Sequence, residues 1–185
     1  MTDYFGTDED DLIDASQLDS DIKNINSGSG NDTITNVSSS QEVRSSEGND
    51  NISGTNFTYR ISGGTGSQDI TVNLKDGISD DGFGTQDTIS GATSIHTDRN
   101  HNTTIYGTDN KEEFWLNGGS NIVDGGGGND RVIYYGKKSS DYSITLVGEE
   151  IHIEGNSTKD ILASMRSLDT IKNFALSYDG ISVKI

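Results

Sequence analysis

The segment Gly125–Val132 reads GGGGNDRV, and it decides how this chain of 185 residues is expected to fold. Four consecutive glycines carry a large entropic cost, because glycine loses more backbone freedom on ordering than any other residue. The Asn-Asp pair and the branched residue that end this segment occur twice more, in SGSGNDTI at 27–34 and SEGNDNI at 46–52. The three segments match a nonapeptide pattern, Gly-Gly-x-Gly-x-Asp-x-apolar-x, in which a six-residue turn leads into a three-residue strand.

The apolar position of this pattern recurs every nine residues in two ladders. Two such half-turns form one coil, so residues 18 apart are expected to stack on one another and pair their backbones. The sequence therefore predicts an all-β fold, a right-handed parallel β-roll or β-solenoid over residues 1–135. The residues of the two ladders are Ile25, Ile34, Val43, Ile52, Ile61 and Ile70, followed by Ile105, Phe114, Val123 and Val132.

Carboxylates fall two residues before the apolar position on alternate half-turns. Asp32 and Asp50 occupy this place and are 18 residues apart, so they are expected to face one another on one edge of the roll. Stacked like charges destabilise a fold unless a cation lies between them, and oxygen ligands favour calcium. The opposite edge, with Lys23, Gln41 and Tyr59 at the same place, is expected to be free of metal.

Other copies of the turn extend this set of candidate calcium ligands. Glu112 lies 18 residues before Asp130, Asp69 and Asp87 occur in looser Gly-x-Gln-Asp turns, and GTDEDDLID offers the first copy. An isolated Gly-Asn-Asp is also compatible with an ordinary turn closed by an Asx hydrogen bond. The full set of predicted metal-site residues, with the turn glycines, is Asp11, Gly28, Gly30, Asp32, Gly48, Asp50, Asp69, Asp87, Asp109, Glu112, Gly126, Gly128 and Asp130.

The segments SGSGNDTIT, SSEGNDNIS and GGGGNDRVI resemble the nonapeptide repeats of RTX proteins, the haemolysin-type calcium-binding repeat. The resemblance covers roughly residues 6–135, and DYSITL and LDTIKNF resemble segments that often follow such repeats. It implies several bound calcium ions, export in an unfolded state by type I secretion, and folding in external calcium at the bacterial surface. Gln41, Tyr59 and Gln68 stand where the motif prefers aspartate, which leaves the number of ions open.

Composition agrees with a fold that depends on a metal. The formal net charge is -17, and residues 1–132 hold 23 of the 30 acids but 7 of the 13 bases. So acidic a chain argues against nucleic acid or anionic lipid as a partner, and no apolar run is long enough to predict insertion into a membrane. There is no cysteine, which excludes disulfides and thiolate chemistry. We expect the metal-free form to be largely disordered and calcium binding to drive folding.

Beyond residue 135 the period changes from nine to two. The segment DYSITLVGEEIHIEG predicts an antiparallel hairpin around a Gly-Glu-Glu turn. Ser157 and Asp160 are expected to cap one or two helical turns, and a strand is expected to precede a turn at 178–180, with a last strand holding Ile181, Val183 and Ile185. Residues 136–185 are therefore predicted to form a cap packed on the roll, within one structural unit.

No residue pattern indicates an enzyme. His96, Asp98 and His101 could bind zinc, but a polar loop is the simpler interpretation of IHTDRNH. The predicted function is a calcium-dependent adhesion module of a large secreted or surface adhesin with flanking domains, which binds a peptide or protein C-terminus or a glycan. The alternatives are a structural folding or spacer module of a secreted enzyme or toxin, and an export signal. The irregular stretch 80–102 favours ligand binding, because functional loops interrupt regular scaffolds.

Overall fold

The computed structural model describes residues 2–44, 46–61, 68–134, 142–155, 157–164 and 171–172. In this part of the chain the protein is all-β, with no α-helix and with one short 3-10 turn, Ala15–Gln17. The strands belong to one large open sheet of 17 strands. Within the described residues no helix is long and apolar enough to cross a membrane.

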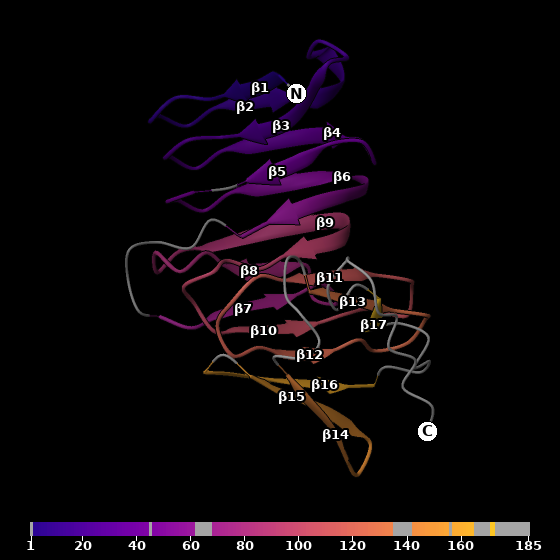
Figure 1. The fold of residues 1–185 in the computed structure, drawn as a ribbon. Coiled ribbons are helices and arrows are strands. Elements are labelled where there is room, and N and C mark those ends of the chain that lie inside the picture. Colours follow the sequence, from indigo (N-terminus) through magenta and orange to yellow (C-terminus); the bar gives the residue numbers. More distant parts are fainter. Residues whose placement is uncertain are drawn as a thin grey trace.

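Among the described residues, seven strands pair in parallel with the strand two places further along the chain, and this pairing produces two columns (Figure 1). The first column is continued by the C-terminal half of β6 and of β9, which are long strands that belong to both columns. Its strands are β1 (Thr2–Phe5), β3 (Ile22–Asn26), β5 (Glu42–Arg44), β6 (Asn51–Arg60), β9 (Gln86–His96), β11 (Glu113–Leu116), β13 (Arg131–Tyr134) and β17 (Ile171–Lys172).

The second column holds the alternate strands and the N-terminal halves of β6 and β9. Its regular order is interrupted by an antiparallel insertion, because β8 pairs with β9 and β7 pairs with β8 before the parallel order resumes at β10. Its remaining strands are β2 (Leu12–Asp14), β4 (Thr33–Val37), β7 (Ile70–Asn73), β8 (Ile78–Asp80), β10 (Thr103–Tyr106), β12 (Ile122–Asp124), β16 (Thr158–Ala163), β15 (Glu150–Gly155) and β14 (Ser143–Val147).

Branched and aromatic side chains from both columns form the core. The predicted 18-residue stacking is confirmed in the N-terminal part of the repeat, where Ile25 pairs with Val43 and Ile34 with Ile52. It is also confirmed where Ile105 pairs with Val123, and these side chains are fully buried. Each branched residue fills the interior between the strands, which is the physical reason for the nine-residue period.

The ladder prediction is wrong between residues 55 and 96. Val43 pairs with Tyr59, 16 residues on, and Ile52 pairs with Ile89, 37 residues on. Ile61 and Ile70 are buried, but Ile70 pairs with Thr103 and does not continue the first ladder. The chain here makes shorter bends and inserts the β7–β8 hairpin, so the spacing of nine cannot continue.

The predicted hairpin at the C-terminal end is confirmed. Ile144 pairs with Ile153 and Leu146 with Ile151, in the antiparallel register expected from the alternation. The helical turns predicted after Ser157 are wrong, because Thr158–Ala163 forms β16, which pairs antiparallel with β15 and parallel with β12. Asp160 is buried in this strand and caps no helix. The turn at 178–180 and the strand at 181–185 lie outside the described residues.

Candidate metal sites at the two edges

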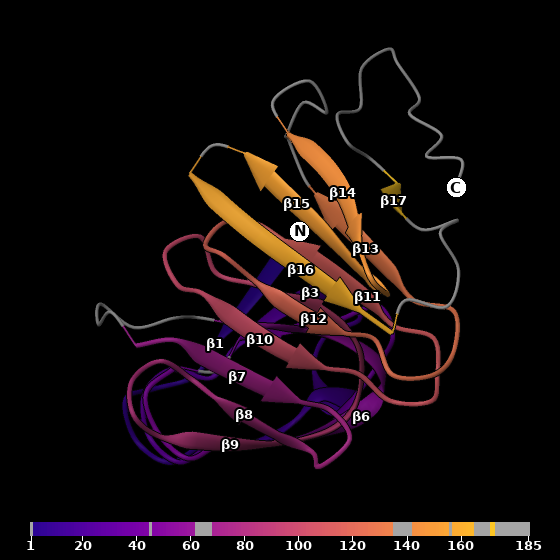
Figure 2. The same ribbon diagram turned by 90° about the horizontal axis from the view of Figure 1, so that it is seen from below.

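The sheet has two edges of turns that connect its columns (Figure 2). We name the aspartate edge the side where the chain passes from the first column to the second, through turns at 6–11, 27–32 and 46–50. The opposite edge carries the return turns, at 38–41, 107–112 and 125–130, together with the bends inside β6 and β9. Each predicted carboxylate is placed by the strand that follows its turn.

On the aspartate edge, the carboxylates form a continuous ladder. The backbone N–H of Asp11 donates to Oδ1 of Asp32 at 2.9 Å, and that of Asp32 donates to Oδ1 of Asp50 at 2.9 Å. The N–H of Asp50 in turn donates to Oδ1 of Asp87 at 3.0 Å. The predicted stacking of Asp32 on Asp50 is therefore observed, and Asp87 extends it across 37 residues.

Two aspartates of this ladder keep one oxygen without a partner. Oδ2 of Asp32 and Oδ2 of Asp50 are buried, and neither has a partner within hydrogen-bond geometry, although the Ser27 side chain and the Ser46 backbone lie near enough to lower the pKa of the two groups. Burial, together with the charges of Asp11 and Asp10, raises the pKa of Asp32 above its ordinary value. Burial and the charges of Asp87 and Asp32 raise the pKa of Asp50 to about 7. A buried carboxylate in this state needs either a proton or a cation.

Asp87 is also buried, but both of its carboxylate oxygens accept hydrogen bonds. Its Oδ2 accepts a hydrogen bond from the hydroxyl of Tyr59 at 2.8 Å, so both carboxylate oxygens have donors. The prediction that placed Tyr59 in a turn of the opposite edge is wrong, because Tyr59 is fully buried in β6. The hydroxyl supplies what a cation would otherwise supply, which makes Asp87 a weaker candidate than Asp32 and Asp50.

The second predicted pair lies on the opposite edge. The N–H of Glu112 donates to Oδ1 of Asp130 at 3.0 Å, and both side chains are 1% exposed. Oδ2 of Asp130 is without a partner, and burial and the Glu112 charge raise its pKa to about 6. Glu112 accepts hydrogen bonds from the N–H and hydroxyl of Thr108. The edge of Gln41, which the sequence predicts to be free of metal, therefore carries a buried carboxylate pair, because the insertion at 55–96 changes which edge the later turns occupy.

The remaining predicted ligands are dispersed. Asp69 is exposed, accepts from the amide of Asn102 at 3.0 Å and does not join Asp87. Asp109 is exposed in the turn before Glu112. Oδ2 of Asp11 accepts from the N–H of Thr7 at 2.6 Å within its own turn. These three therefore lack the buried, unpartnered oxygen found at Asp32, Asp50 and Asp130.

The predicted turn glycines allow the turns to stack closely. Gly28, Gly30, Gly48, Gly126 and Gly128 all have positive φ, between 75° and 138°. A Cβ added to Gly48 would lie 1.9 Å from the carbonyl oxygen of Gly30, and one added to Gly128 would lie 2.0 Å from that of Asn110. Carbonyl oxygens of one turn therefore press against the α-carbons of the next, a cradle that no other residue would leave open.

The oxygens of the turns suit a hard cation better than a transition metal. Within the described ranges, no three His, Asp or Glu side chains converge as a metal-binding group, so a cation would depend on carboxylate pairs and backbone carbonyls. Calcium accepts this mixture of ligands, whereas zinc requires nitrogen or sulfur ligands more often. His101 pairs with Asp98 at 2.5 Å instead of forming the zinc site with His96 that was considered from the sequence.

A further ladder of polar residues was missed in the sequence. The N–H of Thr103 donates to Oδ1 of Asn121 at 3.2 Å, and the N–H of Asn121 donates to Oδ1 of Asp160 at 2.7 Å. All three side chains are buried on the aspartate edge. Thr103 and Asn121 stand two residues before Ile105 and Val123, so the same spacing rule would have found them if it had not been restricted to acids.

No protein-family model matches the chain, and no curated protein matches it at a significant level. A function for this chain must therefore be inferred from the geometry of the site and from the sequence pattern.

Proposed function

We propose that the chain is a calcium-dependent ligand-binding module, folded as a parallel β-roll, of a large secreted or surface adhesin. The observation that carries this proposal is the set of three buried carboxylates, Asp32, Asp50 and Asp130, each with one oxygen held by a backbone N–H and one without a partner. Calcium supplies the missing partner, and its binding energy becomes folding energy. The excess of acids over bases would otherwise oppose compaction.

The residues that would hold the ion are the chain's own carboxylates and turn carbonyls. Asp32 and Asp50 would bind on the aspartate edge, and Glu112 with Asp130 on the opposite edge. Each keeps its Oδ1 or backbone hydrogen bond, so metal binding would leave the stacking of the turns intact. Export in the unfolded state and folding outside the bacterial cell follow from such a calcium requirement and from the RTX resemblance.

Binding of a ligand distinguishes this proposal from a plain spacer. The stretch expected to be an irregular loop, 80–102, instead contains the long strand β9, so that argument for a binding loop is wrong. In its place, the repeat is interrupted by two short bends, and these leave hollows in the surface of about 480 and 530 Å³. A spacer has no need of such an interruption. The ligand would be a peptide or protein C-terminus or a glycan.

Far-UV circular dichroism with added calcium and with EGTA tests the calcium requirement. We expect β-sheet signal in calcium and a largely disordered spectrum in EGTA, with magnesium unable to replace calcium at equal concentration because it dehydrates reluctantly. A spectrum that is the same in calcium and EGTA would refute the proposed role of the metal. A calcium-folded protein that binds no peptide or glycan on an array would support the spacer function instead.

A further inference from the structure

The two hollows meet in one notch on the opposite edge, at Asn56, Thr93 and Lys111. The notch exists because two consecutive bends are short. Across several turns of this edge, successive buried residues are nine positions apart in the sequence, as from Ile34 to Val43 and from Ile105 to Phe114. The separation falls to seven positions from Ile52 to Tyr59 and to six from Ile89 to Ile95. Two shortened bends between longer turns leave a recess.

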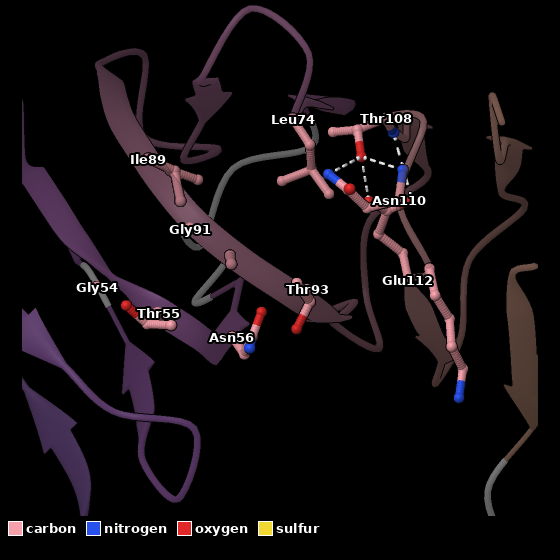
Figure 3. A pocket seen from close by; sticks show the side chains of 12 residues that line it. Gly54, Thr55, Asn56, Leu74, Ile89, Gly91, Thr93, Thr108, Asn110 and Glu112 are labelled. Carbon is pink, nitrogen blue, oxygen red and sulfur yellow. Dashed lines mark hydrogen bonds between the residues drawn. The ribbon is translucent and has the colours of Figure 1, made fainter. Parts of the chain in front are cut away.

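The floor of the notch consists of two backbone bends that pack closely against each other. Gly54–Asn56 and Gly91–Thr93 lie side by side across from Thr108, Asn110 and Glu112 (Figure 3). A Cβ on Gly91 would lie 2.1 Å from the carbonyl oxygen of Gly54, so the bends are stacked without side chains between them. Below the bends, Phe57 and Ala92 are buried and fill the interior. The notch is therefore a preformed feature of the backbone.

The hollow of about 530 Å³ has polar walls and one aromatic platform, whereas Leu74, Ile89 and Ala92 contribute to the lining of the other hollow. Thr58, Ser94 and Glu113 line the polar hollow on the outer face of the first column, beside Trp115. The ring of Trp115 lies 5.0 Å from the ring of His96, tilted by 43°. Burial and the charge of Arg60 lower the pKa of His96 to about 4, so this imidazole is neutral at pH 7.

The charge of this face differs from that of the whole chain. Four of the seven bases in residues 1–132 lie on it or in the adjoining turn 107–112, against Glu42 and Glu113 on the face and Asp109 and Glu112 in the turn, in a chain with a net charge of -17. Glu42 is held by Arg60 at 2.6 and 2.9 Å and by Arg44 at 3.1 Å, and Glu113 is held by Arg131 at 2.9 Å. Among the described residues Lys111 forms no ion pair, and it is exposed at the junction of the two hollows.

We infer that this notch binds an acidic saccharide, with Lys111 holding the carboxylate of a uronic acid residue and Trp115 supporting its ring. The inference rests on the proposed role as a binding module, and it names the ligand class of that module. A sugar ring has one face of C–H groups that packs on an aromatic ring and hydroxyls that bond to Thr58, Ser94, Asn56 and Glu113. Several convergent polar groups beside an aromatic surface fix the orientation of a small ligand.

An acidic peptide is the competing occupant, and the lining disfavours it. Peptide grooves gain specificity from pockets for alternate side chains. On the outer face, the hollow of about 530 Å³ is lined by hydroxyl, amide and charged residues, with Trp115 and His96 as its aromatic surfaces. It therefore offers a ring platform and hydrogen bonds, and no apolar pocket for a peptide side chain.

Binding can be followed by the emission of Trp115, which is the single tryptophan of the chain. The probes are a galacturonic acid tetramer, its carboxyl-reduced neutral form and tetraglutamate, each titrated in saturating calcium. We expect the uronate to change the emission and to bind at least tenfold more tightly than the neutral tetramer or the peptide, because a charge-assisted contact to Lys111 is lost in the first and the sugar ring in the second.

Lys111→Gln should weaken uronate binding about tenfold, because it removes the cation from an exposed turn. Lys159→Gln is the matched control, since Lys159 is exposed on β16 and pairs with Glu154 away from the notch. The inference is overturned if the uronate does not bind below about 1 mM, if tetraglutamate binds as tightly, or if both variants have equal effects.

The failure of this inference can be separated from failure of the calcium proposal. Circular dichroism of Lys111→Gln in saturating calcium should match the wild type, because the substitution leaves the backbone carbonyls of its turn and the carboxylate of Glu112 in place. Calcium-driven folding without uronate binding would overturn the saccharide site alone. Uronate binding to a protein whose fold is indifferent to calcium would overturn the calcium proposal and leave the saccharide site standing.

Discussion

Replacement of Asp50 by asparagine should have opposite effects with and without calcium. Asp50 is 2% exposed, its Oδ1 accepts the N–H of Asp32, and its Oδ2 has no partner. Asparagine retains an oxygen for the first contact and removes the charge. The substitution therefore tests the buried charge and leaves the stacking of the turns unchanged.

The size of the stability change in the metal-free protein follows from the pKa of Asp50, which folding raises from 3.8 to about 7. A group whose pKa is raised on folding binds more protons in the folded state, so the metal-free fold loses stability as pH rises from 3.8 through 7. A shift of about 3 units corresponds to about 4 kcal/mol. Two effects reduce this value: solvent screens the turn at this edge, and the side-chain amide of the asparagine keeps an N–H without a partner. We therefore expect Asp50→Asn to raise the free energy of unfolding of the metal-free protein at pH 8 by about 1–2 kcal/mol.

In calcium the sign reverses, because the variant lacks one ligand of the proposed ion. We expect Asp50→Asn to raise the calcium concentration at the folding midpoint about tenfold, and to increase residual β-sheet signal in EGTA. Both are measured by far-UV circular dichroism at pH 8. Asp21→Asn is the control, since Asp21 is exposed and its substitution changes the net charge equally. An unchanged calcium midpoint, or an equal shift in the control, would refute the reasoning.

Three other outcomes are expected. The calcium midpoint of the wild type should rise as pH falls from 8 to 5.5, because protons compete at carboxyls such as Asp50, whose pKa is raised to about 7; a midpoint independent of pH would contradict this. Gly48→Ala should raise the calcium midpoint strongly, because its Cβ would meet a carbonyl oxygen at 1.9 Å, whereas Gly84→Ala, with positive φ but open space, should raise it less. Tyr59→Phe should lower the free energy of unfolding in calcium by about 1–3 kcal/mol, measured in urea, because it leaves Oδ2 of Asp87 without its donor.

The regular part of the fold could be predicted from the sequence because local spacing determines it. Ile25, Ile34 and Val123 could be placed in the core, and Asp32 could be stacked on Asp50, from a period of nine alone. The hairpin at Ile144 and Ile153 followed in the same way from a period of two. In these segments each residue's place depends on neighbours nine or two positions away, and both are visible in the sequence.

The middle of the chain could not be predicted, because its pairing depends on distant partners. Ile52 meets Ile89 across the β7–β8 insertion, and no local pattern states that 37 residues intervene. The same insertion moves the Glu112 and Asp130 pair to the edge opposite Asp32. The local sequence predicts Asp160 as a helix cap, because its partner in the structure, Asn121, lies 39 residues away.

The motif alone predicts more candidate calcium ligands than the buried carboxylates support, because a buried carboxylate finds one of three environments along this sheet. Asp87 receives the hydroxyl of Tyr59, and Asp160 receives the N–H and amide of Asn121, so both have donors within the protein. Asp32, Asp50 and Asp130 keep an oxygen without a donor, so either a proton or the proposed cation would have to complete each of these sites. The proposed need for calcium would therefore be set by the side chain that faces each carboxylate, and this distribution favours two candidate regions for ions, one on each edge.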